Sequence, residues 1–296
     1  YATDTGGQVW RFDLDPTMRA ANPGNSTGAR LAAISTAGTP EDERRFFYPV
    51  DVAELNDNFF SSEPKYDAIA IGSGYRAHPN DAAVYDRLYV FRDYQLQYTV
   101  ALDPSTNEPT NYPLCNTGGS LAACDNAGTV VPLTEADLVD VTDNKIQDGT
   151  AAEQDAEKLA LQNSNGWFIE LKEDDGTYIG EKTLAKPIIL DGVVYFTTYI
   201  PAGAGDVDPC QAREGNGRLY AVGLNTGEAV FDFNGDSSLS KGDRVLDVGG
   251  GIPSEVVPIF QDAGVTLLIG TGGGARDVDP GIGLPRIRSY WHQSFK

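Results

Sequence analysis

The sequence predicts an all-β fold, a β-propeller that is modified and incomplete in this chain and that carries a partly helical insertion. Three observations lead to this prediction. Strand-like segments recur in pairs, turn-forming residues separate them, and one Ala- and Glu-rich segment interrupts the pattern. The 296 residues include 33 Gly, 17 Pro and 14 Tyr but one Met, a composition that favours strands joined by many turns over a helical bundle.

Each pair of segments contains an apolar strand that ends in Gly or Thr, a variable loop, and a second strand with aromatic residues. Apolar and other residues alternate in "GRLYAVGL" and "VTLLIG", as expected for strands. Units at this spacing indicate propeller blades, each of which buries a face against the next. A β-sandwich with strands of similar length is the alternative. The pairs are 66–74 with 86–93, 187–201 with 217–233, and 254–274 with 286–292.

The opening "YATDTGGQVWRFDL" predicts a strand, an Asp-x-x-Gly turn, and a second strand that contains Trp10 and Phe12. The chain therefore opens on a strand pair with no blade before it. Because an open sheet edge exposes unpaired N–H and C=O groups, we expect a missing N-terminal part of the same chain, or another segment, to pair there. Residues 1–296 are interpreted as the C-terminal portion of a propeller domain.

Residues 134–166 break the strand pattern, because this segment is rich in Ala, Leu, Glu and Lys. Thr134 with Asp137 at its start has the form of a capped helical turn, and Leu159 and Leu161 lie near its end. We interpret 134–166 as a helical insertion within the propeller. Such insertions are where a scaffold commonly carries features specific to its function.

The formal net charge is −21. A negative field of this size repels nucleic acid and anionic membrane surfaces, so neither is an expected partner. No run approaches the about 20 apolar residues that a membrane span needs. An acidic surface suits an exported protein or the binding of divalent cations, although solubility alone would also account for it.

Three cysteines are present. Cys115 and Cys124 bracket "CNTGGSLAAC", a Gly-rich loop with turn residues at its tip. Two thiols this close on such a loop can meet with little strain, so we expect a disulfide between them and an oxidising compartment. Cys210 in "DPCQ" has no predicted partner, and its pairing stays open.

The segment "DFNGDSSLSKGD" (232–243) is a candidate calcium loop, because oxygen-bearing residues occupy positions 1, 3, 5, 7, 9 and 12 of its twelve positions. Ser237 replaces the usual Gly at position 6, where a positive φ would cost about 1 kcal/mol. Asp closes the loop in place of Glu, and Leu239 at position 8 is expected to anchor the loop to the core. A solvated acidic turn is the alternative. The candidate Ca2+ ligands are Asp232, Asn234, Asp236, Ser238, Ser240 and Asp243.

Six motifs in order resemble one family: "YATDTGGQVWRFDL", "AIAIGSGYRAHP", "LVDVTDNKIQ", "GWFIEL…GEKTLAKPIILDGVVYFTTYIP", "DPCQ…GRLYAVGLNTGE" and "GGGIPSEVVPIF". Together they are similar to the C-terminal propeller of the PilC/PilY family, the tip-associated adhesins and assembly factors of type IV pili. The resemblance implies a non-enzymatic, extracellular protein at the pilus tip or outer cell surface. Its implied partners are minor pilins or the pilus tip, and a host or abiotic surface.

Two alternatives remain open at this stage. Propellers with "LYAxxxxTGE" strands include quinoprotein dehydrogenases, which would require an adjacent Cys pair and more regularly repeated Trp than Trp10, Trp167 and Trp291. The two histidines, His78 and His292, form no recognisable catalytic arrangement, and His78 is expected to be a loop or packing residue. The other alternative is an interaction propeller that binds no metal.

Overall fold

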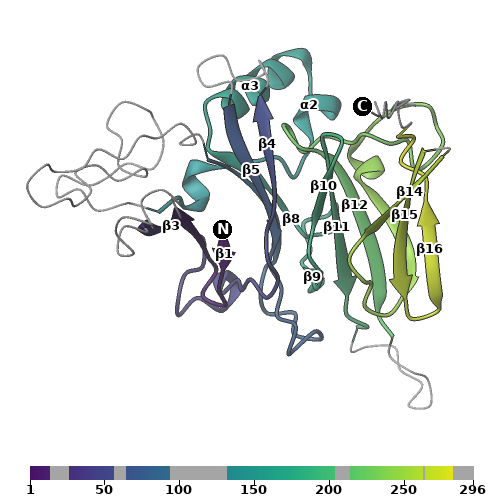
Figure 1. Ribbon diagram of the computed structural model, residues 1–296, viewed down its shortest axis with the longest axis horizontal. Helices are drawn as coiled ribbons and strands as arrows, with labels where there is room; N and C mark the ends of the chain where they lie inside the picture. Colours follow the sequence, from purple (N-terminus) through teal and green to yellow (C-terminus); the bar gives the residue numbers. More distant parts are fainter. Residues whose placement is uncertain (14–26, 57–64, 94–131, 204–213, 263, 283–296) are drawn as a thin grey trace, which may run out of the picture.

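The computed structural model describes residues 1–13, 27–56, 65–93, 132–203, 214–262 and 264–282. These residues form four β-sheets that follow one another in a row (Figure 1). Neighbouring strands within each sheet are antiparallel, apart from one short parallel pair in the second sheet. No helix in this part of the chain is both long and apolar enough to cross a membrane.

The first sheet contains β1 (Ala2–Thr3), β2 (Gln8–Asp13) and β3 (Thr27–Ala33). The second contains, in spatial order, β4 (Asp51–Asn56), β5 (Lys65–Gly72), β6 (Arg87–Asp93), β8 (Gly166–Glu170) and β7 (Val139–Asp140). The third contains β10 (Ile188–Leu190), β11 (Val193–Ile200), β12 (Asn216–Gly223) and β13 (Val245–Gly250), with β9 (Lys182–Thr183) paired to β11. The fourth contains β14 (Val257–Gln261), β15 (Gly264–Thr271) and β16 (Gly274–Val278).

Strands in the middle of the row bury both faces, so alternate residues enter different cores. On β5, Ala68 and Ala70 join the core shared with the third sheet, whereas Ile69 and Ile71 join the core shared with the first sheet. A separate core joins the third and fourth sheets. Burial on both faces explains the nearly continuous apolar runs of these strands. Three successive cores between four sheets confirm the all-β, propeller-like prediction and exclude a two-sheet sandwich.

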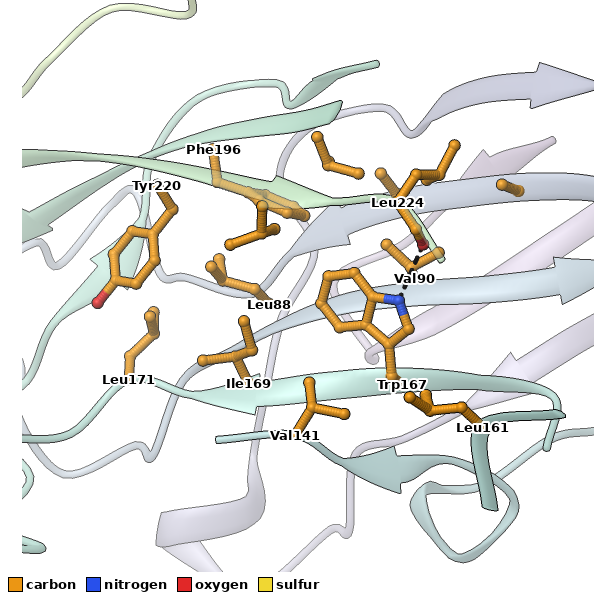
Figure 2. Packing of buried hydrophobic residues seen from close by; sticks show 14 of the residues in the cluster. Leu88, Val90, Val141, Leu161, Trp167, Ile169, Leu171, Phe196, Tyr220 and Leu224 are labelled. Atoms are coloured by element: carbon orange, nitrogen blue, oxygen red, sulfur yellow. Dashed lines mark hydrogen bonds between the residues drawn. The ribbon is translucent and has the colours of Figure 1, made fainter. Parts of the chain in front are cut away.

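The core between the second and third sheets is built around Trp167 (Figure 2). Its side chain is fully buried, and its indole Nε1–H donates a hydrogen bond to the backbone O of Leu224 at 3.0 Å. Phe196 of β11 and Tyr220 of β12 contribute to this core from the third sheet, and Val90 of β6 contributes from the second. Trp167 therefore joins the two sheets by apolar packing and by one hydrogen bond across them.

The opening strand pair forms as predicted. The Asp4 carboxylate accepts hydrogen bonds from the Gly6 N–H at 2.9 Å and the Gln8 N–H at 3.2 Å, which closes the turn between β1 and β2. The same carboxylate accepts a hydrogen bond from the Trp10 indole at 2.9 Å. Asp4 therefore both closes the predicted turn through backbone N–H groups and fixes the Trp10 side chain.

The segment 134–166 contains the 3-10 helix η3 (Glu135–Asp137), the strand β7 and two helices, α2 (Lys145–Asp148) and α3 (Ala151–Gln162). The predicted capped turn at Thr134 is present, with Asp137 completing a capping box. A second capping box begins α3, where Thr150 pairs with Glu153. The segment is also integral to the second sheet, because β7 pairs in parallel with β8 and Leu161 lies in the Trp167 core.

Two predicted strand segments differ in the structure. Residues 228–233 form no strand: one isolated bridge joins Ala229 to Val222, and the Asp232 carboxylate accepts backbone N–H groups further along the chain. Such local bonds compete with a strand ladder. Residues 243–260 do not form one unit, because β13 ends at Gly250 in the third sheet and β14 belongs to the fourth sheet. Residues 286–292 lie outside the described part of the chain.

Gly74 is required where β9 approaches the second sheet. The Thr183 N–H donates to the Ser73 backbone O at 2.9 Å, which brings the two segments together. A Cβ at Gly74 would lie 2.1 Å from the Thr183 backbone O. We expect Gly74→Ala to lower the free energy of unfolding by about 1–3 kcal/mol, measured by urea denaturation. Gly273→Ala is the matched control, because nothing lies within 4 Å of its added Cβ; equal losses for the two variants would contradict the prediction.

Asp86 makes stability depend on pH. Its side chain is buried and accepts a hydrogen bond from the Ser73 hydroxyl at 2.7 Å. Burial raises the pKa of Asp86 to about 6, although the Ser73 hydrogen bond and the charge of Lys182 oppose this rise. The folded state therefore favours the neutral form of Asp86. The contribution of this neutral form to the free energy of unfolding is fully present below the pKa of an unfolded Asp, 3.8, and is lost as pH rises through about 6.

We expect Asp86→Asn, which mimics the neutral acid, to raise stability at pH 8 relative to the wild type by about 2 kcal/mol. At pH 4 the two proteins should be nearly equal, because Asp86 is then largely protonated in the fold. Urea midpoints at the two pH values measure the difference. Glu181→Gln is a useful second variant, because burial also raises the pKa of that carboxyl. The prediction is contradicted if Asp86→Asn leaves the pH profile unchanged.

Candidate functional site

The candidate loop 232–243 lies in the connection between β12 and β13 and ends in the 3-10 helix η4 (Lys241–Arg244). Its first part is exposed, including the candidate ligands at Asp232, Asn234 and Asp236. Its last candidate ligand, Asp243, is fully buried. The loop therefore divides into an exposed acidic turn and a buried anchor.

Side chains in the exposed turn accept hydrogen bonds from backbone N–H groups that follow them. Asp232 accepts from Gly235 at 2.7 Å and Ser237 at 2.8 Å, and Asn234 Oδ1 accepts from Asp236 at 2.8 Å. The Asp236 carboxylate accepts from the Ser238 N–H at 2.8 Å and its hydroxyl at 2.6 Å. These bonds from Ser238 lower the pKa of Asp236, because they favour its charged form.

The backbone is left-handed at Gly235, with φ 77°, and at Ser237, with φ 68°. The positive φ anticipated at Ser237 is therefore present, at a cost of about 1 kcal/mol for a residue with a side chain. The hydrogen bond that Ser237 donates to Asp232 offsets part of this cost. The turn curls because two left-handed residues lie within it.

Asp243 holds the loop closed from within. Its Oδ1 accepts a hydrogen bond from the Asn234 N–H at 3.2 Å, and its Oδ2 accepts from the Ser240 N–H at 3.0 Å and hydroxyl at 2.9 Å. The bond from the Ser240 N–H belongs to the capping box of η4, in which the Ser240 side chain in turn accepts the Asp243 backbone N–H. Ser240, a further candidate ligand, thus contacts Asp243 directly. Both carboxylate oxygens of Asp243 therefore have hydrogen-bond partners within the loop.

Leu239 does not anchor the loop, because its side chain is 43% exposed; that expectation was wrong. The anchor is Arg244, a buried residue whose guanidinium donates to the backbone O atoms of Val141 at 2.8 Å and Thr142 at 3.1 Å. Burial lowers the pKa of Arg244 to about 10. The Lys241 N–H adds a hydrogen bond to the Asp148 carboxylate at 2.9 Å.

These contacts join two segments that the sequence analysis treated separately, the loop 232–243 and the segment 134–166. Gln147 of α2 strengthens the connection, because its side chain donates to the Ala229 backbone O and accepts from the Ala229 N–H, both at 2.9 Å. No local sequence signal identifies this contact, since the partners are about 80 to 100 residues apart in the chain.

The loop supplies the ligand chemistry of a calcium site. Carboxylate, amide and hydroxyl oxygens are the hard donors that calcium prefers. Within the described part of the chain, no group of three or more His, Cys, Asp or Glu side chains is arranged to hold a metal ion. Asp232 accepts two hydrogen bonds, fewer than the about four lone-pair sites of a carboxylate, so it retains acceptor capacity.

Other residues singled out from the sequence have simpler roles, or lie where the structure gives no description. Asp279 accepts a hydrogen bond from the Gly281 N–H at 2.8 Å, which forms a turn in "DVDPG". His78 packs on Tyr75 with ring centroids 4.6 Å apart in an exposed loop, as predicted. The predicted disulfide pair, Cys115 and Cys124, lies outside the described residues, as does Cys210.

The fold of this chain is similar to that of a solved structure. No family model and no curated protein sequence matches the chain. Among solved structures, the crystal structure of the Pseudomonas aeruginosa PilY1 C-terminal domain is similar, with a TM-score of 0.53 and 18% sequence identity. The match covers 95% of this chain and 57% of that one, so this chain spans less than two thirds of the length of its structural relative. The propeller-like fold of the described residues is therefore similar to that of the PilY1 C-terminal domain.

Proposed function

We propose that this chain is the non-enzymatic propeller portion of a type IV pilus tip-associated adhesin and biogenesis factor, which supports pilus assembly and surface attachment. The observation that carries the proposal is the similarity to the PilY1 C-terminal domain over 95% of the chain. The six motifs that resemble the PilC/PilY family support the same role, because they occur in family order.

The proposed location is extracellular, at the pilus tip or on the outer cell surface, with minor pilins as the protein partners. The net charge of −21 supports an exported protein and argues against nucleic acid as a partner. A host or abiotic surface is the proposed attachment target. The paired, propeller-like sheets would provide a rigid scaffold for these contacts, because each sheet packs on its neighbour through a buried core.

We also propose that the loop 232–243 binds one calcium ion. Asp232, Asn234 and Asp236 would supply side-chain oxygens from the exposed turn, and the bound ion would neutralise their charge. Asp243, Ser238 and Ser240 complete the proposed ligand set. Because Arg244 and Lys241 connect the loop to the segment 134–166, an ion that stiffens the loop would also restrain that segment against the third sheet.

Deletion of the gene for the full-length protein in its source organism tests the pilus role. We expect few surface pili by electron microscopy and weak surface attachment, both restored by the wild-type gene. If the protein promotes assembly against retraction, a second deletion that abolishes retraction should restore pili but not attachment. Normal numbers of pili and normal attachment in the single deletion would overturn the proposal.

The absorbance spectrum of the purified full-length protein tests the non-enzymatic assignment separately. A quinoprotein dehydrogenase would carry a quinone chromophore and would oxidise alcohols or sugars with an artificial electron acceptor. We expect neither a quinone band nor such activity after incubation with the quinone and calcium. Reconstitution of either signal would favour the enzyme alternative over the pilus role.

A further inference from the structure

The sequence contains three Asn-Gly pairs, and the structure places them in three different environments. Asn165–Gly166 and Asn216–Gly217 occur at the starts of strands, whereas Asn234–Gly235 lies in the exposed turn of the candidate loop. Asn-Gly is the dipeptide in which a backbone nitrogen reaches the preceding side-chain amide most easily, because Gly has no Cβ to obstruct the approach. The local structure therefore determines which pair can react.

The first two pairs are held by the fold. Gly166 is buried so closely that an added Cβ would lie 2.0 Å from the Val90 backbone O, and the Asn165 backbone O accepts a hydrogen bond from Arg92 at 2.8 Å. Asn216 and Gly217 lie within β12, which is paired to β11 on one side and β13 on the other. Bending either backbone toward its Asn side chain would break tertiary contacts or ladder hydrogen bonds.

The third pair is exposed, and hydrogen bonds engage both the Gly235 nitrogen and the Asn234 side-chain amide. Nothing lies within 4 Å of a Cβ placed on Gly235. The Gly235 N–H donates to Asp232 Oδ1 at 2.7 Å, so a carboxylate is in position to accept its proton. Asn234 Oδ1 accepts the Asp236 N–H at 2.8 Å, which polarises the amide carbonyl and directs the side chain forward along the turn.

We propose that Asn234 is a self-modification site at which the loop promotes its own deamidation. The Gly235 nitrogen attacks Asn234 Cγ, the new N–Cγ bond closes a five-membered succinimide, and the N–H proton passes to the Asp232 carboxylate. The Cγ–Nδ2 bond breaks, and the departing nitrogen takes that proton and leaves as ammonia. Water then opens the ring at either carbonyl, so the net reaction converts Asn and water to Asp or isoaspartate and ammonia.

Both products alter the loop. Aspartate adds a negative charge between Asp232 and Asp236, whereas isoaspartate lengthens the backbone by one carbon and displaces the turn that these residues maintain. The deamidation does not depend on calcium binding. Under the proposed function the two are nevertheless coupled, because aspartate at 234 raises the number of charged ligands and a bound ion would occupy the carboxylate that accepts the proton.

Incubation of the purified, folded protein at mildly alkaline pH with chelator present, followed by peptide mapping, tests this proposal. We expect Asp and isoaspartate to accumulate at Asn234 about tenfold or more faster than at Asn165 or Asn216. Asp232→Ser should slow the conversion at Asn234 by a similar factor while keeping a hydroxyl acceptor for the Gly235 N–H. Asp279→Ser is the matched control, because Asp279 also accepts a backbone N–H from a nearby Gly.

Equal conversion at all three asparagines, or no conversion at Asn234, would overturn the proposed selectivity. Unchanged or faster conversion in Asp232→Ser would overturn the role of the carboxylate. Far-UV circular dichroism of each variant checks that the fold is retained, and Asn234→Gln should show no conversion at position 234. Repeating the incubation with calcium separates this proposal from the calcium proposal. A calcium-insensitive rate would count against the metal site and leave the deamidation supported.

Discussion

Replacement of Trp167 by Ala is expected to lower the free energy of unfolding by about 3–5 kcal/mol. This loss is a large part of the 5–15 kcal/mol that typically stabilises a folded domain. The reason is geometric: the indole is fully buried in the core between the second and third sheets, where the side chain of an Ala would leave a cavity. The Leu224 backbone O would also lose its 3.0 Å hydrogen bond from the indole.

Urea denaturation followed by circular dichroism measures this effect. Trp167→Phe separates its two components, because it retains most of the apolar volume and removes only the N–H donor. Phe12→Ala is the control for loss of an aromatic ring, since Phe12 is 52% exposed on β2; we expect it to cost well under half as much. If the urea midpoint of Trp167→Ala is close to that of Phe12→Ala, the stability of the two sheets does not depend on this core.

The all-β class could be predicted because the strand signal is local. In β5 and β6, runs of apolar residues bounded by turn residues mark strands with two buried faces. Residues 228–233 show the limit of this reasoning. Phe231 and Phe233 alternate as in a strand, yet Asp232 between them bonds to the following turn.

The environment of the candidate loop could not be predicted in the same way. The calcium-loop pattern calls for a positive φ at its sixth position, where Ser237 replaces the usual Gly, and Ser237 does have a positive φ. The burial of Asp243 and the exposure of Leu239 depend on where η4 meets the segment 134–166, which involves Arg244 and Val141, 103 residues apart. Contacts at such separations are set by the packing of whole sheets and not by a local pattern.

The structure also explains why the calcium prediction is best tested at Asp236. Asp243 is buried and accepts three hydrogen bonds, so its replacement would destabilise the loop even without a metal. Asp232 accepts backbone N–H groups from Gly235 and Ser237 and shapes the turn. The Asp236 carboxylate accepts hydrogen bonds from Ser238 within the exposed turn, so removing it should perturb the fold of the loop less than removing Asp232 or Asp243.

Calcium at a hundred times its dissociation constant is expected to raise the free energy of unfolding of the wild-type protein by about 2.7 kcal/mol, if the ion binds only the folded loop. The gain in stability should come from the attraction between one divalent cation and the carboxylates of an acidic turn, in a chain of net charge −21. Thermal melts in calcium and in chelator measure it. Asp236→Ser should lose most of the calcium-dependent gain while melting close to the wild type in chelator.

Asp175→Ser is the matched control for this experiment. Asp175 is an exposed carboxylate that accepts the backbone N–H of the residue two positions later, Thr177, at 2.9 Å, just as Asp236 accepts that of Ser238 at 2.8 Å. Hydrogen bonds from these partners lower the pKa of both carboxyl groups. The two substitutions should therefore cost the same in chelator, and only Asp236→Ser should abolish the response to calcium. If the wild-type protein melts at the same temperature with and without calcium, 232–243 is a solvated acidic turn. If Asp175→Ser loses the response to calcium as fully as Asp236→Ser does, the calcium effect arises elsewhere on the acidic surface.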